Sequence, residues 1–89
     1  MAVQYKRTVI PRVVFNYHEL ETRIGIYCVV NRISKGNFAA LLGFTYSSLR
    51  YKLDGVVPFT TYEMYALKDK LSIKDEEMVS IFLTPLVEG

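Results

Sequence analysis

The sequence has little of what builds covalently or metal-stabilised folds. It contains one cysteine, Cys28, one histidine, His18, and no tryptophan. A single cysteine excludes an intrachain disulfide, and His18 has no cysteine or carboxylate pair at metal-ligand spacing. We therefore expect no metal or other cofactor, core packing for Cys28 and a surface position for His18.

Signatures of membrane insertion and of catalysis are also missing. No apolar run approaches the roughly 18 residues that cross a bilayer, and the opening MAVQYKR lacks the apolar stretch of a secretory signal. Ser47 and Ser48 have no nearby histidine base, and there is no glycine-rich phosphate loop. We expect a cytoplasmic protein that is not an enzyme and binds neither a membrane nor a small-molecule substrate.

The chain is short and its charges are segregated. Its 89 residues carry a formal net charge of +2, which fits a single domain. Through Lys52 there are eight basic and two acidic residues, and from Leu53 onward three lysines and seven acids. Such asymmetry suggests a polyanionic partner for the first part and solvent or a protein partner for the second, with chance segregation as the alternative.

Periodicity predicts an all-α fold of about five short helices, preceded by an extended basic arm or strand. Residues 1–15 form the arm, because Pro11 and the β-branched runs around it disfavour a helix. Residues 16–84 form the folded domain and 85–89 a tail. The expected helices span 16–31, 35–42, 46–53, 60–71 and 74–83.

Capping residues mark where these helices begin. Asn16 is expected to open the first helix, with the Glu19 side chain accepting the Asn16 backbone N–H in a capping box. Ser34 and Thr45 are expected to cap the next two helices. Thr60 and Glu63 form a second T-x-x-E capping box, and the second and third helices end at glycines. The predicted core combines the inward positions Leu20, Ile24, Cys28, Phe38, Ala39, Leu42, Leu49, Leu53, Met64, Leu67, Leu71, Met78, Ile81 and Phe82.

Two of these helices are joined by a tight turn in the manner of a helix-turn-helix. Ala39 is small where the helices must approach, Gly43 supplies the turn and Leu49 fills the space between them. The segment resembles the helix-turn-helix of the lambda-repressor and Cro family. The resemblance rests on Phe38-Ala39, Leu42-Gly43, Thr45, Ser48-Leu49, Lys52-Leu53-Asp54-Gly55 and Pro58-Phe59-Thr60-Thr61-Tyr62-Glu63, and covers about residues 15–83.

The resemblance implies a set of DNA contacts. Lys35 stands where the family usually has a glutamine that contacts phosphate or a base. Tyr46, Ser47 and Tyr51 stand where side chains commonly reach base edges in the major groove. The helical wheel independently places Ser47 and Tyr51 outward when Leu49 and Leu53 point inward, with Ser48 and Arg50 beside them.

Charged and hydroxyl side chains complete the predicted interface. Arg50 is expected to make the strongest contact, since a bidentate guanidinium–guanine pair contributes about 1–3 kcal/mol of discrimination. Lys52 is expected to contact phosphate, and Ser34, Ser47 and Ser48 to add backbone contacts. Asp54 departs from the family's usual asparagine, so we expect it to turn away from DNA or to bond its own backbone.

The basic arm allows two compatible arrangements. Lys6, Arg7 and Arg12 can lie along the DNA backbone or in a minor groove. Alternatively, residues 8–15 pair with the same segment of a second copy as a dimer ribbon.

The sequence therefore predicts a phage-type transcriptional regulator that binds an operator in double-stranded DNA as a homodimer. The alternative is a protein-interaction module on the same scaffold, antirepressor-like or antitoxin-like, which the acidic C-terminal portion and Asp54 favour.

Overall fold

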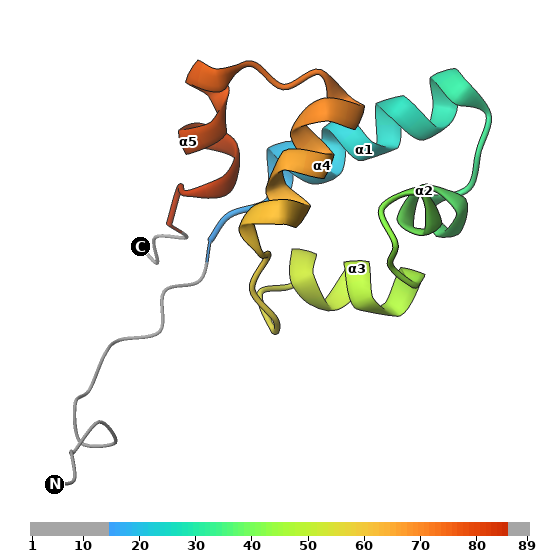
Figure 1. Ribbon diagram of the computed structural model, residues 1–89, viewed down its shortest axis with the longest axis horizontal. Coiled ribbons are helices and arrows are strands. Elements are labelled where there is room, and N and C mark those ends of the chain that lie inside the picture. The colour runs from blue at the N-terminus through green and yellow to red at the C-terminus, as the bar shows by residue number, and fades with distance from the viewer. Residues whose placement is uncertain (1–14, 86–89) are drawn as a thin grey trace, which may run out of the picture.

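Residues 15–85 form five α-helices and one short 3-10 segment (Figure 1). The computed structural model describes residues 15–85, so the predicted arm lies almost entirely outside the described residues, as does the end of the tail. The helices are α1 (His18–Asn31), α2 (Lys35–Leu41), α3 (Tyr46–Leu53), α4 (Thr61–Leu71) and α5 (Met78–Phe82), with η2 at Asp75–Glu77. Over residues 15–85 there is no β-strand, which confirms the all-α prediction, and no helix that is both long and apolar enough to cross a bilayer.

The core lies around α1, which contacts α2, α4 and α5. The side chains of Leu20, Ile24 and Cys28 are buried along one side of α1, as their i, i+4, i+8 spacing predicts. Phe38, Leu49, Leu67 and Phe82 meet them from the other helices, each no more than 1% exposed. Helix α1 is therefore the central helix of the core.

The first helix begins two residues later than the sequence predicts. Its N-cap position is Tyr17, which is 7% exposed and packs edge-on against Phe59 at 5.2 Å between ring centroids. The Asn16 carboxamide still accepts a bond from the His18 N–H at 2.9 Å, but Glu19 turns to Arg23. Burial of the Tyr17 ring sets the start of the helix, so the predicted Asn16–Glu19 capping box does not form.

The caps of the next three helices form as predicted. The side-chain oxygens of Ser34, Thr45 and Thr60 accept backbone N–H bonds from Asn37, Ser48 and Glu63 at 3.0, 3.1 and 3.2 Å. The Glu63 carboxylate accepts the Thr60 N–H at 2.8 Å, which closes the predicted capping box. Helix α2 ends at Leu41, one residue earlier than expected.

The C-terminal segment is less regular than predicted. One helix over 74–83 was expected, whereas the structure has η2 followed by the short α5. Buried Ile81 and Phe82, with half-buried Met78, still form the predicted inner face. The chain then returns to its start, where the Asn16 N–H donates to the Thr84 carbonyl at 2.8 Å and Phe15 and Pro85 form an isolated antiparallel bridge.

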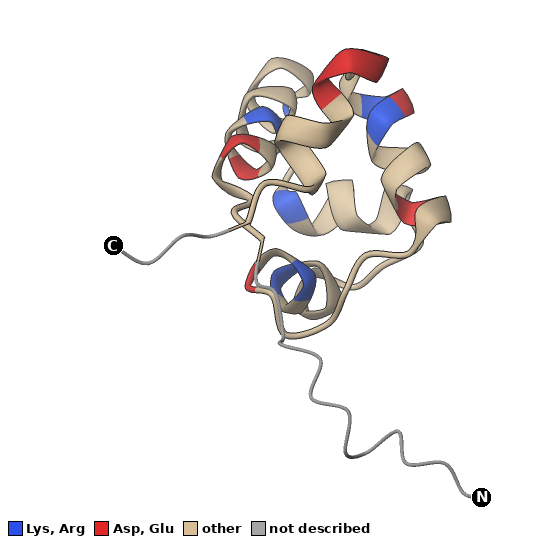
Figure 2. Cartoon of the chain, turned by 90° about the vertical axis from the view of Figure 1, so that its left-hand side faces the viewer, with Lys and Arg blue, Asp and Glu red and all other residues tan. Residues whose placement is uncertain are grey.

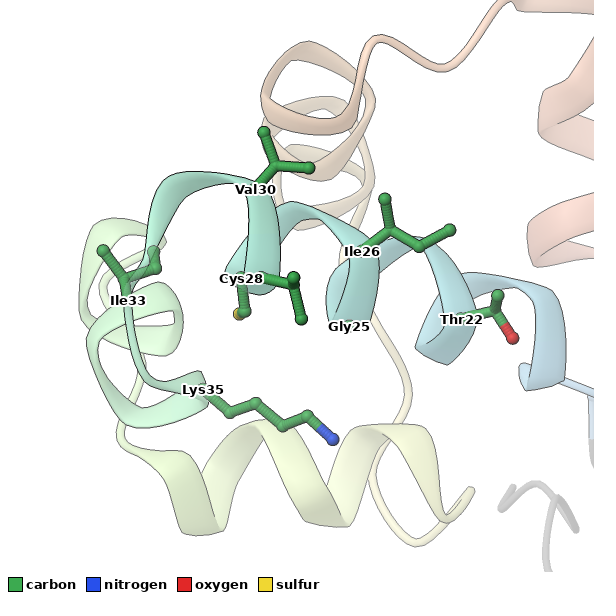
Figure 3. A pocket seen from close by; sticks show the side chains of 8 residues that line it. Thr22, Gly25, Ile26, Cys28, Val30, Ile33 and Lys35 are labelled. Atoms are coloured by element: carbon green, nitrogen blue, oxygen red, sulfur yellow. The ribbon is translucent and has the colours of Figure 1, made fainter.

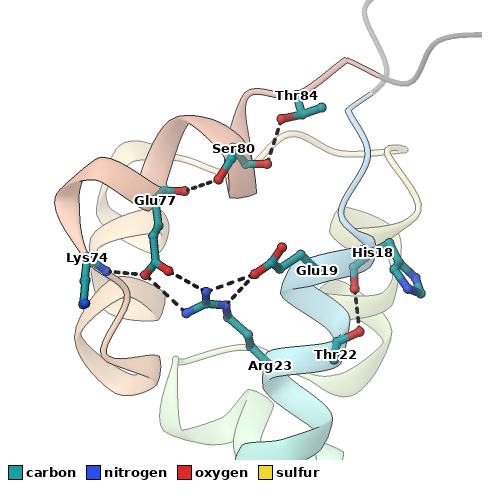
Figure 4. Close-up of polar contacts among 8 residues, drawn as sticks. All are labelled: His18, Glu19, Thr22, Arg23, Lys74, Glu77, Ser80 and Thr84. Atoms are coloured by element: carbon teal, nitrogen blue, oxygen red, sulfur yellow. Dashed lines mark hydrogen bonds and ion pairs between the residues drawn. The ribbon is translucent and has the colours of Figure 1, made fainter.

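Arg23 links α1 to the C-terminal segment. Its guanidinium lies between the carboxylates of Glu19, at 3.0 Å, and Glu77, at 2.9 Å (Figure 4). The Lys74 N–H also donates to Glu77, at 2.9 Å. These two donors lower the pKa of Glu77, the Lys74 backbone contributing more than Arg23.

The lowered pKa of Glu77 predicts acid sensitivity of this junction. A carboxyl whose pKa is depressed by folding stabilises the native state above its ordinary value of 4.5 and loses that contribution as the pH falls through the native pKa. We expect Glu77→Gln to reduce the difference in unfolding free energy between pH 7 and pH 3, measured by urea unfolding. Glu76→Gln is the control, because Glu76 is exposed and forms no ion pair within residues 15–85. An equal change in both variants would contradict the assignment.

Candidate nucleic-acid interface

Helices α2 and α3 form a compact helix-turn-helix unit. Gly43 in the turn has φ 81°, a left-handed conformation that glycine adopts without steric cost. The Phe44 N–H donates to the Ala39 carbonyl at 2.9 Å, which folds the turn back onto α2. Ala39 is fully buried and Leu49 is 1% exposed, so both occupy the inter-helix positions that the sequence predicts.

One side of α3 is open to solvent and carries hydroxyl and aromatic groups. Tyr46 and Tyr51 are 46% and 54% exposed, and Ser47 is exposed between them. We call these three residues the recognition face. Ser48, predicted to contact DNA beside them, is half-buried, and its backbone N–H is used by the Thr45 cap. The outward direction of Ser47 and Tyr51 agrees with the helical-wheel prediction.

Arg50, expected to make the strongest DNA contact, is held by two carboxylates. Its Nη2 lies 2.6 Å from Glu21 Oε2 on α1 and 2.8 Å from Asp54 Oδ1, and its Nε donates to the same Asp54 oxygen at 3.1 Å. These bonds, with Asp54 the larger contributor and Glu21 next, raise the pKa of Arg50. A guanidinium so engaged can offer its paired donors to guanine only after an ion pair opens. Asp54 bonds this side chain and not its own backbone, so the second of the two expected arrangements of Asp54 does not form.

Lys52, the predicted phosphate contact, is buried. It is only 9% exposed because it follows Leu49 by three positions and therefore lies on the inner side of α3. Its ammonium lies 3.0 Å from the Glu63 carboxylate, donates to the Pro58 carbonyl at 3.3 Å and sits 5.4 Å from the centre of the Phe44 ring. Lys52 thus ties α3 to the start of α4, and the structure corrects the expectation that it faces DNA.

Lys35 is the basic side chain that remains available beside the recognition face. It is exposed at the first position of α2, and within residues 15–85 it forms no ion pair. It lines a small cleft together with Tyr46 and Arg50, which places it next to α3. Ser34, immediately before it, is exposed but uses its hydroxyl oxygen to cap α2.

The folded body carries no net charge. Residues 15–85 contain eight basic and eight acidic side chains, which are interspersed over the helices (Figure 2). Residues 1–14 contain Lys6, Arg7 and Arg12 and no acid. These three predicted arm contacts lie outside the described residues, yet they account for the positive charge that the body lacks.

Sequence reasoning missed the two acidic residues that shape this site. Glu21 lies 29 residues from Arg50 along the chain, and Glu63 was interpreted only as a capping residue. No local pattern pairs them with α3, because each partnership depends on how the helices pack. Within residues 15–85 no group of three or more potential ligands is placed to hold a metal ion.

Comparison with known proteins identifies no relative of this chain. No protein-family model matches the chain, and no curated protein or solved structure matches it either.

Proposed function

We propose that this protein is a sequence-specific double-stranded DNA-binding regulator, similar to the lambda-repressor and Cro group, that reads the major groove with α3. The observation that carries the proposal is the recognition face: Tyr46, Ser47 and Tyr51 stand exposed on a helix whose opposite side is fixed in the core by Leu49. A helix presented in this way has the dimensions that fit the major groove.

The chemistry of the recognition face suits base edges. A serine hydroxyl and a phenol can each donate or accept a hydrogen bond, so they can match different edge patterns. The phenol rings also offer apolar surface to a thymine methyl group. The face contains no carboxylate, which would be repelled by the phosphates that border the groove.

Phosphate contacts come from outside α3 in this proposal. Lys35 is exposed next to Tyr46, and the arm residues Lys6, Arg7 and Arg12 supply further positive charge. Arg50 acts as a positioning residue, because its bond to Glu21 links α3 to α1 while its bond to Asp54 holds the guanidinium at the end of α3. In this proposal the uncharged side chains of the recognition face determine base specificity. The arm provides the attraction to the DNA backbone.

Two copies are needed for such a short reading helix. The eight residues of α3 can contact only a few base pairs, whereas a dimer reads two half-sites about 34–36 Å apart. We therefore include a homodimer in the proposed function.

Substitution of Tyr51 tests the recognition face. Binding sites are first selected from a random duplex pool, and affinities are then measured by fluorescence anisotropy. We expect Tyr51→Ala to weaken binding to the selected site about tenfold, near the lower end of the 1–3 kcal/mol typical of base contacts. Its binding to unrelated duplex DNA should change much less.

Tyr62→Ala is the matched control, because Tyr62 is a tyrosine 88% exposed on α4 and not part of the recognition face. We expect this variant to keep the affinity and the sequence preference of the parent. Equal losses in the two variants, or none in Tyr51→Ala, would show that α3 does not read the bases.

A protein-interaction module is the second candidate, and the balanced charge of the body favours it. Residues 15–85 have no net charge, and α3 uses both of its basic side chains within the fold. Titration with mixed duplex DNA at two salt concentrations separates the candidates. Binding that weakens steeply with salt supports DNA binding, and no binding at low salt supports the protein partner.

A further inference from the structure

The second half of α1 is apolar on the side that faces solvent as well as on the side that faces the core. From Ile24 to Val30 the helix carries no charged side chain. Ile24 and Cys28 are buried, whereas Ile26, Val29 and Val30 are 58%, 78% and 73% exposed. A helix that is hydrophobic all round is normally covered on all sides, and clustered exposed apolar groups mark contact sites.

This outer surface has the shape of a ridge between two grooves. Ile26 and Val30, four positions apart, lie together on one side of α1 and form the ridge, since both line each of the two grooves (Figure 3). On one side lies an open groove of about 640 Å³ lined by Gly25, Val29 and Ile33 and by the charged side chain of Lys35. On the other lies one of about 320 Å³ lined by Tyr27 and Leu71 and by the basic side chains of Arg23 and Lys70. We call this surface the α1 face.

Within residues 15–85, no packing contact explains the place of Gly25 in the middle of a helix. A Cβ atom built on it meets nothing within 4 Å, and its backbone is not in a left-handed conformation. Glycine is unfavourable inside helices compared with alanine. On an exposed apolar surface, however, a missing side chain lets another backbone approach closely.

We propose that the α1 face is the surface on which a second copy of this chain packs, with the two α1 helices crossing in antiparallel directions near Gly25. Ridges formed by residues four apart pack into the grooves of a partner helix, and here one surface carries both features. Two-fold pairing requires such a self-complementary patch. Each Ile26–Val30 ridge then enters a groove of the other copy.

The charges at the two ends of α1 favour this antiparallel pairing. Glu19 lies in the first turn, where it already pairs with Arg23 at 3.0 Å, and Arg32, which forms no ion pair within residues 15–85, follows the last turn. They lie at nearly equal distances along the chain on either side of Gly25. In an antiparallel crossing the basic end of one copy therefore approaches the acidic end of the other, and the uncharged centre introduces no repulsion.

The size of the surface indicates a weak dimer. A standard interface buries about 800 Å² per partner, roughly an eighth of the 6379 Å² surface of this chain. About three turns of one helix provide less than that area. We therefore expect a dissociation constant in the micromolar range without DNA, the regime of small and transient interfaces.

Sedimentation equilibrium of the full chain without DNA tests the proposal, so its outcome does not depend on whether the proposed function is correct. We expect a reversible monomer–dimer equilibrium over about 1–200 µM. Val30→Lys should weaken dimerisation at least tenfold, because it places an ammonium against the apolar and basic side chains that line a groove of the second copy. Val79→Lys is the matched control, since Val79 is a 64% exposed helical valine on α5, and it should leave dimerisation unchanged.

Gly25→Ala separates association from folding. The open space around Gly25 predicts a melting temperature equal to or above that of the parent, while the added methyl group should weaken dimerisation by holding the helices apart. A parent chain that stays monomeric over the whole concentration range would overturn the proposal, leaving the α1 face to residues 1–14 or to a foreign partner. Equal effects of Val30→Lys and Val79→Lys would overturn it as well.

Discussion

Replacing Lys6, Arg7 and Arg12 together by glutamine should lower the affinity for duplex DNA by about 10²–10³-fold at ~0.1 M salt, if the proposed function holds. Each phosphate neutralised by a cation contributes about 0.9 to the slope of log affinity against log salt, so three contacts contribute about 2.7. The effect is large because residues 15–85 are electrically balanced and α3 pairs both of its cations internally. Anisotropy titrations at several salt concentrations give the slope directly.

The loss of DNA affinity should depend on where the replaced basic residues lie and not only on how many charges are removed. The control replaces Lys68 and Lys74 by glutamine, two lysines outside both the recognition face and the α1 face. Lys68 pairs with the exposed Asp75, and Lys74 forms no ion pair within residues 15–85. The control removes two charges from the body, and we expect a much smaller change in slope per charge. If the control matched the arm variant, the arm would contribute only net charge and no specific phosphate contacts.

Leu49→Ala should cost about 2–5 kcal/mol of unfolding free energy, the range for truncating a fully buried leucine. Leu49 is 1% exposed and belongs to the cluster that joins α3 to the rest of the core. Folded domains are stable by only about 5–15 kcal/mol, so this one change removes a large share of that stability. The loss should also reduce DNA binding, because it loosens the support of the recognition face.

Urea unfolding followed by circular dichroism measures this cost, with Leu53→Ala as a graded control. Leu53 is only half-buried, so its truncation removes fewer packing contacts and should cost distinctly less. A cost below about 1 kcal/mol for Leu49→Ala would mean that the site collapses around the missing atoms and that α3 is held mainly by other contacts.

The parts of the fold that depend on neighbouring residues were predictable from the sequence. Ser34, Thr45 and Thr60 cap their helices because a side-chain oxygen needs only the N–H groups of the following turn. The inward positions of Leu49 and Ala39 follow from helical periodicity in the same way. The all-α architecture and the exposed Ser47 and Tyr51 were therefore accessible without coordinates.

The parts that depend on packing between distant segments were not predictable. Lys52 was expected to contact phosphate, yet it lies in the interior, where lysine is rarely found, and Phe44, Pro58 and Glu63 together satisfy its ammonium. Arg50 was expected to make the strongest DNA contact. Its partner Glu21 lies 29 residues earlier, on α1, and reaches it only in the folded chain. The start of α1 shifted for the same reason, since the Tyr17 ring is buried against Phe59.

The buried thiol of Cys28 can report when α1 separates from the core. Desolvation raises the pKa of this thiol, with nearby Lys35 opposing the shift weakly, and the side chain is only 6% exposed. Because the thiolate is the reactive form and Cys28 borders the open groove beside α1 with little exposure, alkylating reagents should modify it slowly in the packed state and faster when α1 separates from the core. Because Cys28 is the only cysteine in the chain, its alkylation rate reports how often α1 separates from the core.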